Sequence, residues 1–193
     1  MTKNQFNPLQ HPICFSQPLR LAPSGWLSHI PFSMVLMELL EPDIFVELGT
    51  YYGASYCAFC QAVDELDLET HCFAIDTWSG DPETGYYESE VFKDLRSFHD
   101  PRYRHFSKLI RSTFQEALDD FEDHSIDLLH IDGCHKYSAV KQDWINWRSK
   151  LSSRGVVLFH DTAVHEEGFG VWKLWHEVKQ KYPSFEFDHG NGL

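Results

Sequence analysis

The chain has 193 residues, enough for one domain whose hydrophobic core needs neither disulfides nor metal ions to hold it together. Its 16 basic and 29 acidic residues give a net charge of −13, which argues against a nucleic-acid or anionic-lipid surface. No apolar stretch is long enough to span a membrane, and the N-terminal residues lack the apolar core of a signal peptide. We therefore expect a cytoplasmic protein with neither nucleic-acid nor membrane partners.

The five cysteines are odd in number and scattered, which indicates reduced thiols and no disulfide framework. Cys57 and Cys60 have the spacing of a metal-binding or redox pair, but no second pair accompanies them. Burial within a helix is the favoured interpretation of this pair, and a zinc or redox role is the alternative.

Residues 1–25 are rich in Pro, Gln and Asn without any period, and they predict an irregular arm before a single domain at 26–193. Pro31 suits the first turn of a helix that continues to about residue 40. Beyond it, short apolar runs alternate with helical patterns. Strands are expected at 44–48, 71–76, 104–110, 125–132, 155–161 and 184–189, and helices at 54–66, 91–99, 113–121, 136–151 and 170–182.

This alternation predicts an α/β fold of Rossmann-like, doubly wound type, with a mostly parallel sheet and helices on both faces. In such sheets, ligands bind beyond the carboxyl ends of the strands. The chain places Glu47, Asp76, Asp132 and the pair His160-Asp161 at those ends. Because unpaired buried carboxylates are costly, we interpret them as one shared site for a cation and a ligand that carries hydroxyls or positive charge. Simple capping of the helices that follow is the alternative.

The loop after the first strand contains Gly49 and Gly53, which allow a sharp turn and a close approach of a ligand to the backbone. Its spacing differs from the dinucleotide fingerprint, and Glu47 before the loop would repel a pyrophosphate but suit an ammonium group. Asp76, at the end of the next strand, can accept hydrogen bonds from both hydroxyls of a ribose. A plain tight turn and an ion-paired surface acid are the alternatives.

The later strand ends provide donors for a metal ion. Asp132, His160 and Asp161 supply two carboxylates and one imidazole. Oxygen ligands suit Mg²⁺ or Mn²⁺, and the imidazole moves the preference toward Mn²⁺, Fe²⁺ or Zn²⁺. His135, three residues beyond Asp132, could take the proton from a hydroxyl held on that ion. The alternatives are a surface histidine and a helix-capping Asp161.

Four segments, VELGTYYGAS, AIDTWSGD, LLHIDGCHKYSAVKQDW and GVVLFHDT, resemble class I S-adenosylmethionine-dependent methyltransferases. More narrowly, they resemble the small-molecule and sugar O-methyltransferase branch, with its macrocin-type and cephalosporin-hydroxylase-like proteins (methyltransferase domain family 24). The resemblance implies an enzyme that moves a methyl group from S-adenosylmethionine to a hydroxyl of a small molecule, a sugar or glycoside, with help from Mg²⁺ or Mn²⁺. A metal-dependent hydroxylase-like enzyme and a non-catalytic module of a larger carbohydrate-modifying protein are the alternatives.

The resemblance also implies roles for single residues. The methionine part of the cofactor would lie against Glu47, Gly49, Tyr51, Gly53 and Ser55. The nucleoside would be bound at its ribose by Asp76 and at its adenine by Thr77, Trp78, Thr113 and Phe114. Asp132, His160 and Asp161 fall on the metal-ligand positions, and His135 falls on the position of the catalytic base. Catechol-type enzymes have Lys as base and Asp-Asn where this chain has His160-Asp161.

The stretch 79–100, with Asp81, Tyr86, Tyr87 and Phe92, is longer than a connection needs and is interpreted as a lid on the substrate side. Trp26 and His29 are candidates to cover the cofactor. The sheet of the resembled family ends in an antiparallel hairpin, and this sequence stops where the last strand would begin, so we expect either a very short last strand or a piece of a longer polypeptide. A missing strand would leave an exposed edge that a second subunit could cover, so a homodimer is expected.

Overall fold

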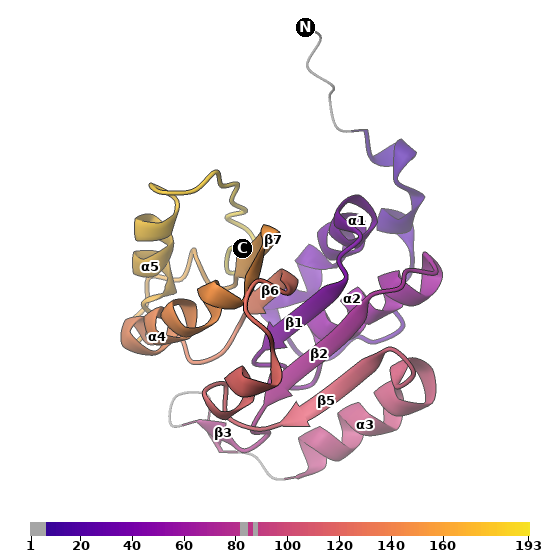
Figure 1. Ribbon diagram of the computed structural model, residues 1–193, viewed down its shortest axis with the longest axis horizontal. Coiled ribbons are helices and arrows are strands. Elements are labelled where there is room, and N and C mark those ends of the chain that lie inside the picture. The colour runs from indigo at the N-terminus through magenta and orange to yellow at the C-terminus, as the bar shows by residue number, and fades with distance from the viewer. Residues whose placement is uncertain (1–6, 82–84, 87–88) are drawn as a thin grey trace, which may run out of the picture.

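A five-stranded parallel sheet forms the centre of the computed structural model, which describes residues 7–81, 85–86 and 89–193 (Figure 1). The strands are β1 (Ile44–Leu48), β2 (His71–Asp76), β5 (Ser107–Arg111), β6 (Ile126–Ile131) and β7 (Leu151–Phe159). They lie in the order β5-β2-β1-β6-β7, and every neighbouring pair is parallel. The chain direction across the sheet reverses between β1 and β6, where a ligand crevice is expected in such folds.

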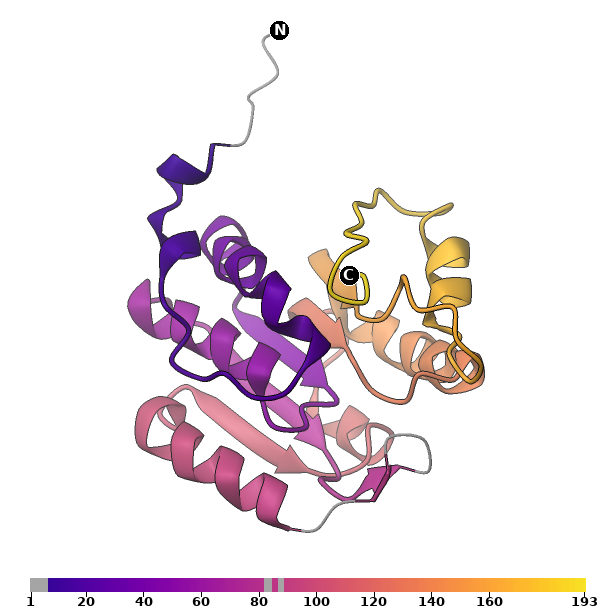
Figure 2. The ribbon, with the colours of Figure 1, turned by 180° about the vertical axis from the view of Figure 1, so that it is seen from behind.

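Helices cover both faces of the sheet (Figures 1 and 2). One face packs against α1 (Ile30–Leu40), α2 (Ala54–Glu65) and α3 (Glu90–Tyr103), and the other against α4 (Tyr137–Trp147), α5 (Val171–Val178) and the 3₁₀ helix η4 (Glu116–Asp120). Successive strand residues point to opposite faces, so Phe45 joins the first core cluster and Val46 the second. The predicted doubly wound α/β fold is confirmed.

Helix α2 is buried along nearly its whole length, because it packs between the sheet, α1 and the N-terminal arm. Ten of its twelve residues are buried, including Cys57 and Cys60. Both cysteines are free thiols within the first core cluster, as the packing interpretation predicts.

The N-terminal arm is more ordered than its composition indicates. It contains three short 3₁₀ helices, η1 (Pro8–Gln10), η2 (Pro12–Phe15) and η3 (Gly25–His29), and η3 extends the arm beyond its predicted end at residue 25 to the start of α1. Arg20 holds the arm to the domain, since its Nε donates to the carbonyl oxygen of Tyr52 at 2.7 Å and its guanidinium pairs with Asp94. Within the described ranges, no helix combines the length and the apolar character needed to cross a membrane.

Several predicted elements have different bounds or do not form. The segment 184–189 is not a strand: it runs as an irregular chain whose Phe187 exchanges two backbone hydrogen bonds with Leu193 around a tight turn. Residues 113–121 contain only the 3₁₀ helix η4. Strand β7 begins earlier than predicted, because Leu151 already pairs with Ile126 of β6. The next pair is Val156 with Leu128, so the polar residues between Leu151 and Val156 interrupt the ladder. Helix α4 ends early and continues as η5 (Arg148–Lys150), and α5 also ends before its predicted limit.

Candidate cofactor and acceptor site

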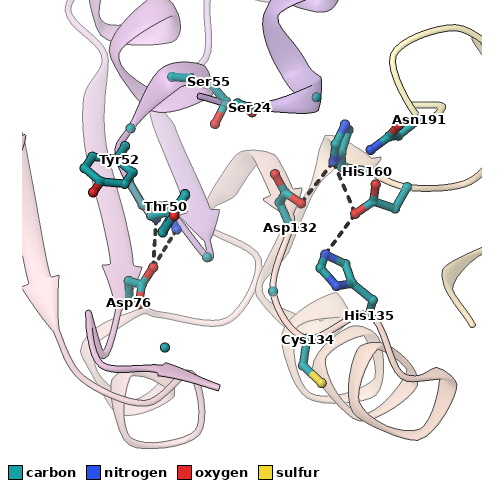
Figure 3. Close-up of a pocket in the computed structure, with 18 of the residues that line it drawn as sticks. Ser24, Thr50, Tyr52, Ser55, Asp76, Asp132, Cys134, His135, His160 and Asn191 are labelled. Atoms are coloured by element: carbon teal, nitrogen blue, oxygen red, sulfur yellow. Dashed lines mark hydrogen bonds and ion pairs between the residues drawn. The ribbon is translucent and has the colours of Figure 1, made fainter. Parts of the chain in front are cut away.

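A cavity of about 530 Å³ lies at the carboxyl ends of β1, β2, β6 and β7. The loops that follow these strands form its walls, together with parts of the arm and of the C-terminal turn (Figure 3). Most of the site residues expected from the sequence line it: Gly49, Tyr51, Gly53, Ser55, Asp76, Thr77, Thr113, Phe114, Asp132, His135, His160 and Asp161. Of the strand-end residues that the sequence assigns to one shared site, all except Glu47 line this one cavity.

The loop after β1 depends on glycine at position 49. Gly49 has a φ of +85°, and a Cβ there would lie 2.1 Å from the backbone oxygen of Asp132. The contact is with backbone, so no side-chain movement could relieve it. The loop after β1 can therefore approach the loop after β6 only while this residue has no side chain, and that approach closes one wall of the cavity.

Asp76 organises the same loop from β2. Its Oδ2 accepts hydrogen bonds from the backbone N–H groups of Thr50 and Tyr51, both at 2.9 Å (Figure 3). Its Oδ1 accepts one from the backbone N–H of Trp78 at 2.7 Å. A carboxylate offers about four acceptor positions, so three are used within the protein. The one position that remains could accept from one ribose hydroxyl, and not from the two that the sequence predicts.

On the opposite wall, two carboxylates and two imidazoles form one connected group (Figure 3). The Nδ1 of His160 lies 3.1 Å from Oδ1 of Asp132 and 3.5 Å from Oδ2 of Asp161. The Nε2 of His135 lies 2.9 Å from the same Asp161 oxygen. On its other side, His160 Nε2 lies 3.1 Å from the carbonyl oxygen of Gly190 in the C-terminal turn.

These contacts change the ionisation of the group. Burial favours the neutral form of each side chain, but the opposite charges outweigh burial. They raise the pKa of His160 to about 10, and they hold the pKa of Asp132 and the pKa of Asp161 below the usual range. At neutral pH, His160 is therefore a cation between two anions.

The donor atoms that suit a metal ion differ from the predicted set. Atoms of Asp132, His135 and Asp161 lie within 4.8 Å of one another, as ligands of a single ion would. Both ring nitrogens of His160 instead face oxygen acceptors, so this imidazole donates hydrogen bonds and offers no lone pair. The residues fit a divalent cation, with His135 where the sequence prediction had placed His160.

Two of the predicted cofactor residues lie behind the cavity and not on its surface. Glu47 is fully buried, and its Oε2 lies 2.8 Å from Nδ1 of His130. Trp78 is also fully buried; its indole N–H donates to the carbonyl oxygen of Tyr51 at 2.9 Å, and its ring packs against Phe92. Trp78 therefore supports the glycine loop on the side that faces away from the cavity.

The predicted lid, residues 79–100, contributes only in part to the cavity. Gly80, in the short β3 (Gly80–Asp81) that pairs with β4 (Gly85–Tyr86), lines the cavity. Phe92 belongs to α3 and packs inward against Trp78, while Tyr86 is largely exposed. Tyr87 lies outside the described residues.

Several lining residues come from segments that the sequence patterns did not connect with the site. They are Pro23, Ser24, Gly25, Phe169 and Asn191. Phe169 stacks on the ring of His135 at 4.6 Å between centroids. The sequence Gly190-Asn191-Gly192 signals a turn, but only the three-dimensional structure places that turn beside His160. Trp26 and His29, expected to cover the cofactor, are buried outside the cavity walls.

Residues 46–162 match the family model described as methyltransferase domain. The chain belongs to this family. The match covers more than half of the sequence, and it confirms the prediction of an S-adenosylmethionine-dependent methyltransferase domain.

The protein y4gI of Sinorhizobium fredii is 54% identical over 179 residues, which cover 92% of this chain and 20% of that protein. The chain therefore spans about a fifth of the length of this relative. Among solved structures, a methyltransferase from Geobacter sulfurreducens aligns over 99% of this chain and 89% of its own, with a TM-score of 0.62 and 14% identity.

Two further solved structures share the fold. A Staphylococcus aureus protein provisionally named a caffeoyl-CoA O-methyltransferase aligns over 96% of this chain and 87% of its own, with a TM-score of 0.65 and 13% identity. The methyltransferase PaMTH1 of Podospora anserina, solved with bound S-adenosylhomocysteine, covers 69% of this chain and 52% of its own, with a TM-score of 0.54 and 18% identity. At these identities, the likeness establishes the fold.

Proposed function

We propose that the chain transfers the methyl group of S-adenosylmethionine to a hydroxyl oxygen of a small molecule, a sugar or glycoside. One observation carries this proposal: the glycine loop with Asp76 and the group of carboxylates and imidazoles face each other across a single cavity (Figure 3). The first wall suits a donor nucleoside, and the second suits a hydroxyl that must lose a proton.

The donor would lie along the loops after β1, β2 and β5. In this proposal, the methionine part is held by Gly49, Tyr51, Gly53 and Ser55, with Glu47 behind them, and the ribose by Asp76. The adenine would lie near Thr77, Thr113 and Phe114, which line the cavity, with Trp78 supporting the loop below. An acidic chain also favours a ligand with sulfonium and ammonium groups.

Methyl transfer to oxygen is a displacement in one step. The acceptor oxygen forms a bond to the methyl carbon, the carbon–sulfur bond breaks with its electron pair left on sulfur, and the hydroxyl proton passes to a base. The protein must therefore align the two reactants and receive that proton. His135 is the proposed base, with its Nε2 held by Asp161.

A divalent ion would be held by Asp132 and Asp161, with an imidazole as further ligand, and when bound it would lower the pKa of the acceptor hydroxyl. The arrangement of donor atoms favours His135 as that imidazole over His160. His160, a cation between the two acids, keeps both carboxylates oriented toward the cavity. With the ion bound, His135 would act as its ligand and the hydroxyl proton would pass to solvent; without an ion, His135 would take the proton itself.

The sugar acceptor rests on the resemblance to the sugar O-methyltransferase branch and on the polar character of the second wall. Asn191, beside His160, adds an amide to its carboxylates and imidazoles, and such groups pair with a polyol (Figure 3). The relative y4gI, about five times longer, supports a role as one module of a larger protein. A cytoplasmic location and a homodimer stay predictions.

Calorimetric titration with S-adenosylhomocysteine, with EDTA and then with Mg²⁺ or Mn²⁺, tests the donor half of the proposal. Binding is expected in both conditions. Methyl transfer to a panel of sugars, glycosides and catechols tests the acceptor half, with turnover expected on a sugar hydroxyl. A chain that binds no S-adenosylhomocysteine in either condition would contradict the proposal, and bound iron with oxygen-dependent turnover would favour the hydroxylase-like alternative.

The role of His135 is tested by His135→Ala, with His165→Ala as a control. His165 is an exposed histidine that does not line the cavity. His135→Ala is expected to lower kcat at least 100-fold and to leave S-adenosylhomocysteine binding unchanged. Full activity of His135→Ala would remove this residue from the mechanism.

A further inference from the structure

Three fully buried side chains connect the N-terminal arm with the end of β1. The indole Nε1 of Trp26, in η3, donates to Nε2 of His130 at 3.1 Å, and Nδ1 of His130 lies 2.8 Å from Oε2 of Glu47. Glu47 and His130 are register partners on the neighbouring strands β1 and β6, so their side chains lie on the same face of the sheet. The Trp26 ring packs edge-on against His130, with 5.3 Å between centroids.

The direction of both hydrogen bonds follows from the chemistry of the indole. An indole N–H can only donate, so Nε2 of His130 must accept and carries no proton. The single ring proton of His130 is then on Nδ1, and it is donated to the Glu47 carboxyl. Trp26 therefore selects one tautomer of His130, and that tautomer fixes one oxygen of Glu47.

The other oxygen of Glu47 is left over. This oxygen, Oε1, is buried, and it has no hydrogen-bond partner among the residues that the structure describes. Burial raises the pKa of the Glu47 carboxyl, and the hydrogen bond from His130 and the nearby Ser55 hydroxyl oppose that rise. A buried carboxylate with one unpaired oxygen is costly unless a cationic group reaches it.

The surroundings of Glu47 indicate where such a group would come from. Gly49, two residues further along the chain, and Ser55 both line the cavity. Gly25, the residue before Trp26, lines it as well, and Ser24 Oγ starts η3 by accepting from the backbone N–H of Trp26 at 3.0 Å. The buried carboxyl is therefore next to the wall proposed for the methionine end of the donor.

We propose that Trp26 and His130 are positioning residues, which hold the Glu47 carboxylate directly behind the cavity wall, where its charge attracts the ammonium group of the bound nucleoside. The inference rests on the proposed function, and it gives the N-terminal arm a part in donor recognition. The arm carries Trp26, whose indole fixes the tautomer of His130, and His130 in turn fixes the orientation of the Glu47 carboxylate.

A pair of nucleosides separates positioning from general stability. S-adenosylhomocysteine carries the ammonium group, whereas 5′-methylthioadenosine has the same adenosine and sulfur but no amino-acid portion. Trp26→Phe removes the donor and keeps an aromatic ring. It is expected to weaken binding of S-adenosylhomocysteine about 10-fold and to leave binding of 5′-methylthioadenosine unchanged, both measured by calorimetry.

Trp147→Phe is the matched control. Trp147 is another fully buried tryptophan, in the core cluster on the opposite face of the sheet, and its Nε1 has no partner among the residues that the structure describes. It is expected to leave the ratio of the two affinities at the wild-type value. If Trp26→Phe does not fold, Glu47→Gln gives the same readout, because the amide oxygen can still accept from His130 while the charge is lost.

Selective loss of S-adenosylhomocysteine binding in Trp26→Phe or Glu47→Gln supports the inference. Equal weakening of both nucleosides overturns it, because that result indicates a structural role only. A wild-type chain that binds neither nucleoside contradicts the proposed function itself, and this inference with it. The failure of the two proposals can thus be distinguished.

Discussion

Asp76 provides the sharpest test of how the cavity is built, because its carboxylate receives three backbone N–H groups from the loops that it joins. In Asp76→Asn, one oxygen becomes an amide nitrogen. If the remaining oxygen takes the Oδ2 position, the bonds from Thr50 and Tyr51 persist without their charge, and the N–H of Trp78 faces another donor.

The cost can be worked out bond by bond. A hydrogen bond to a charged acceptor contributes about 1.5–3 kcal/mol, and a neutral one about 0.5–1.5 kcal/mol. Weakening two such bonds by about 1–1.5 kcal/mol each and losing a third should lower the free energy of unfolding by about 3.5–6 kcal/mol, a large part of the total stability of a domain of this size. Binding of S-adenosylhomocysteine should fall as well, because the glycine loop loses its support.

Urea denaturation measures the first effect, and calorimetry measures the second. Asp120→Asn is a suitable control, since Asp120 is exposed at the end of η4. If Asp76→Asn unfolds at the wild-type urea concentration but no longer binds S-adenosylhomocysteine, Asp76 is a ligand contact only. That result would refute its role in organising the loop.

Two further substitutions test the site and the sheet. Gly49→Ala should abolish binding of S-adenosylhomocysteine, because its Cβ would lie 2.1 Å from the Asp132 backbone oxygen. Gly85→Ala is the control: Gly85 has a similar φ of +86°, but a Cβ there would meet nothing within 4 Å, so this variant should bind normally. Equal binding by both variants would contradict the steric argument. Asp127→Asn should lower the free energy of unfolding at neutral pH, since the Ser152 hydroxyl, the Asp43 backbone N–H and Arg154 together outweigh burial and hold the pKa of Asp127 below its usual value. This stabilisation is present above the ordinary pKa of about 4 and is lost as the pH falls through the lower folded-state pKa, so the stabilities of wild type and variant should converge in acid; a constant gap across urea titrations at decreasing pH would argue against it.

The sheet and most of its helices could be predicted because local pattern and burial agree. Runs such as residues 44–48 and 126–131 are mostly apolar, as strands of a covered parallel sheet are, and they form β1 and β6. The apolar alternation at 184–189 also looked like a strand, but Gly190 to Gly192 turn the chain at once, and the segment finds no ladder in the sheet. A periodic pattern indicates which residues can be buried, and not which strand will pair with them.

The site was predictable at the level of strand ends, because parallel strands deliver their last residues to one edge of the sheet. Asp132, His135 and Asp161 do meet there. Which imidazole turns toward the metal donors was not predictable, since it depends on Gly190, a residue thirty positions away from His160 in sequence that takes up the second ring nitrogen. The burial of Glu47 behind the cavity depends in the same way on Trp26, whose arm gave no periodic signal.

Diffraction from crystals grown with S-adenosylhomocysteine and Mn²⁺ would test the central claim most directly, because anomalous scattering locates the metal independently of the nucleoside. The nucleoside is expected between Gly49 and Asp76, and the manganese among Asp132, His135 and Asp161 in the same cavity. Manganese elsewhere on the molecule, or a nucleoside outside this cavity, would contradict a shared site for donor and metal.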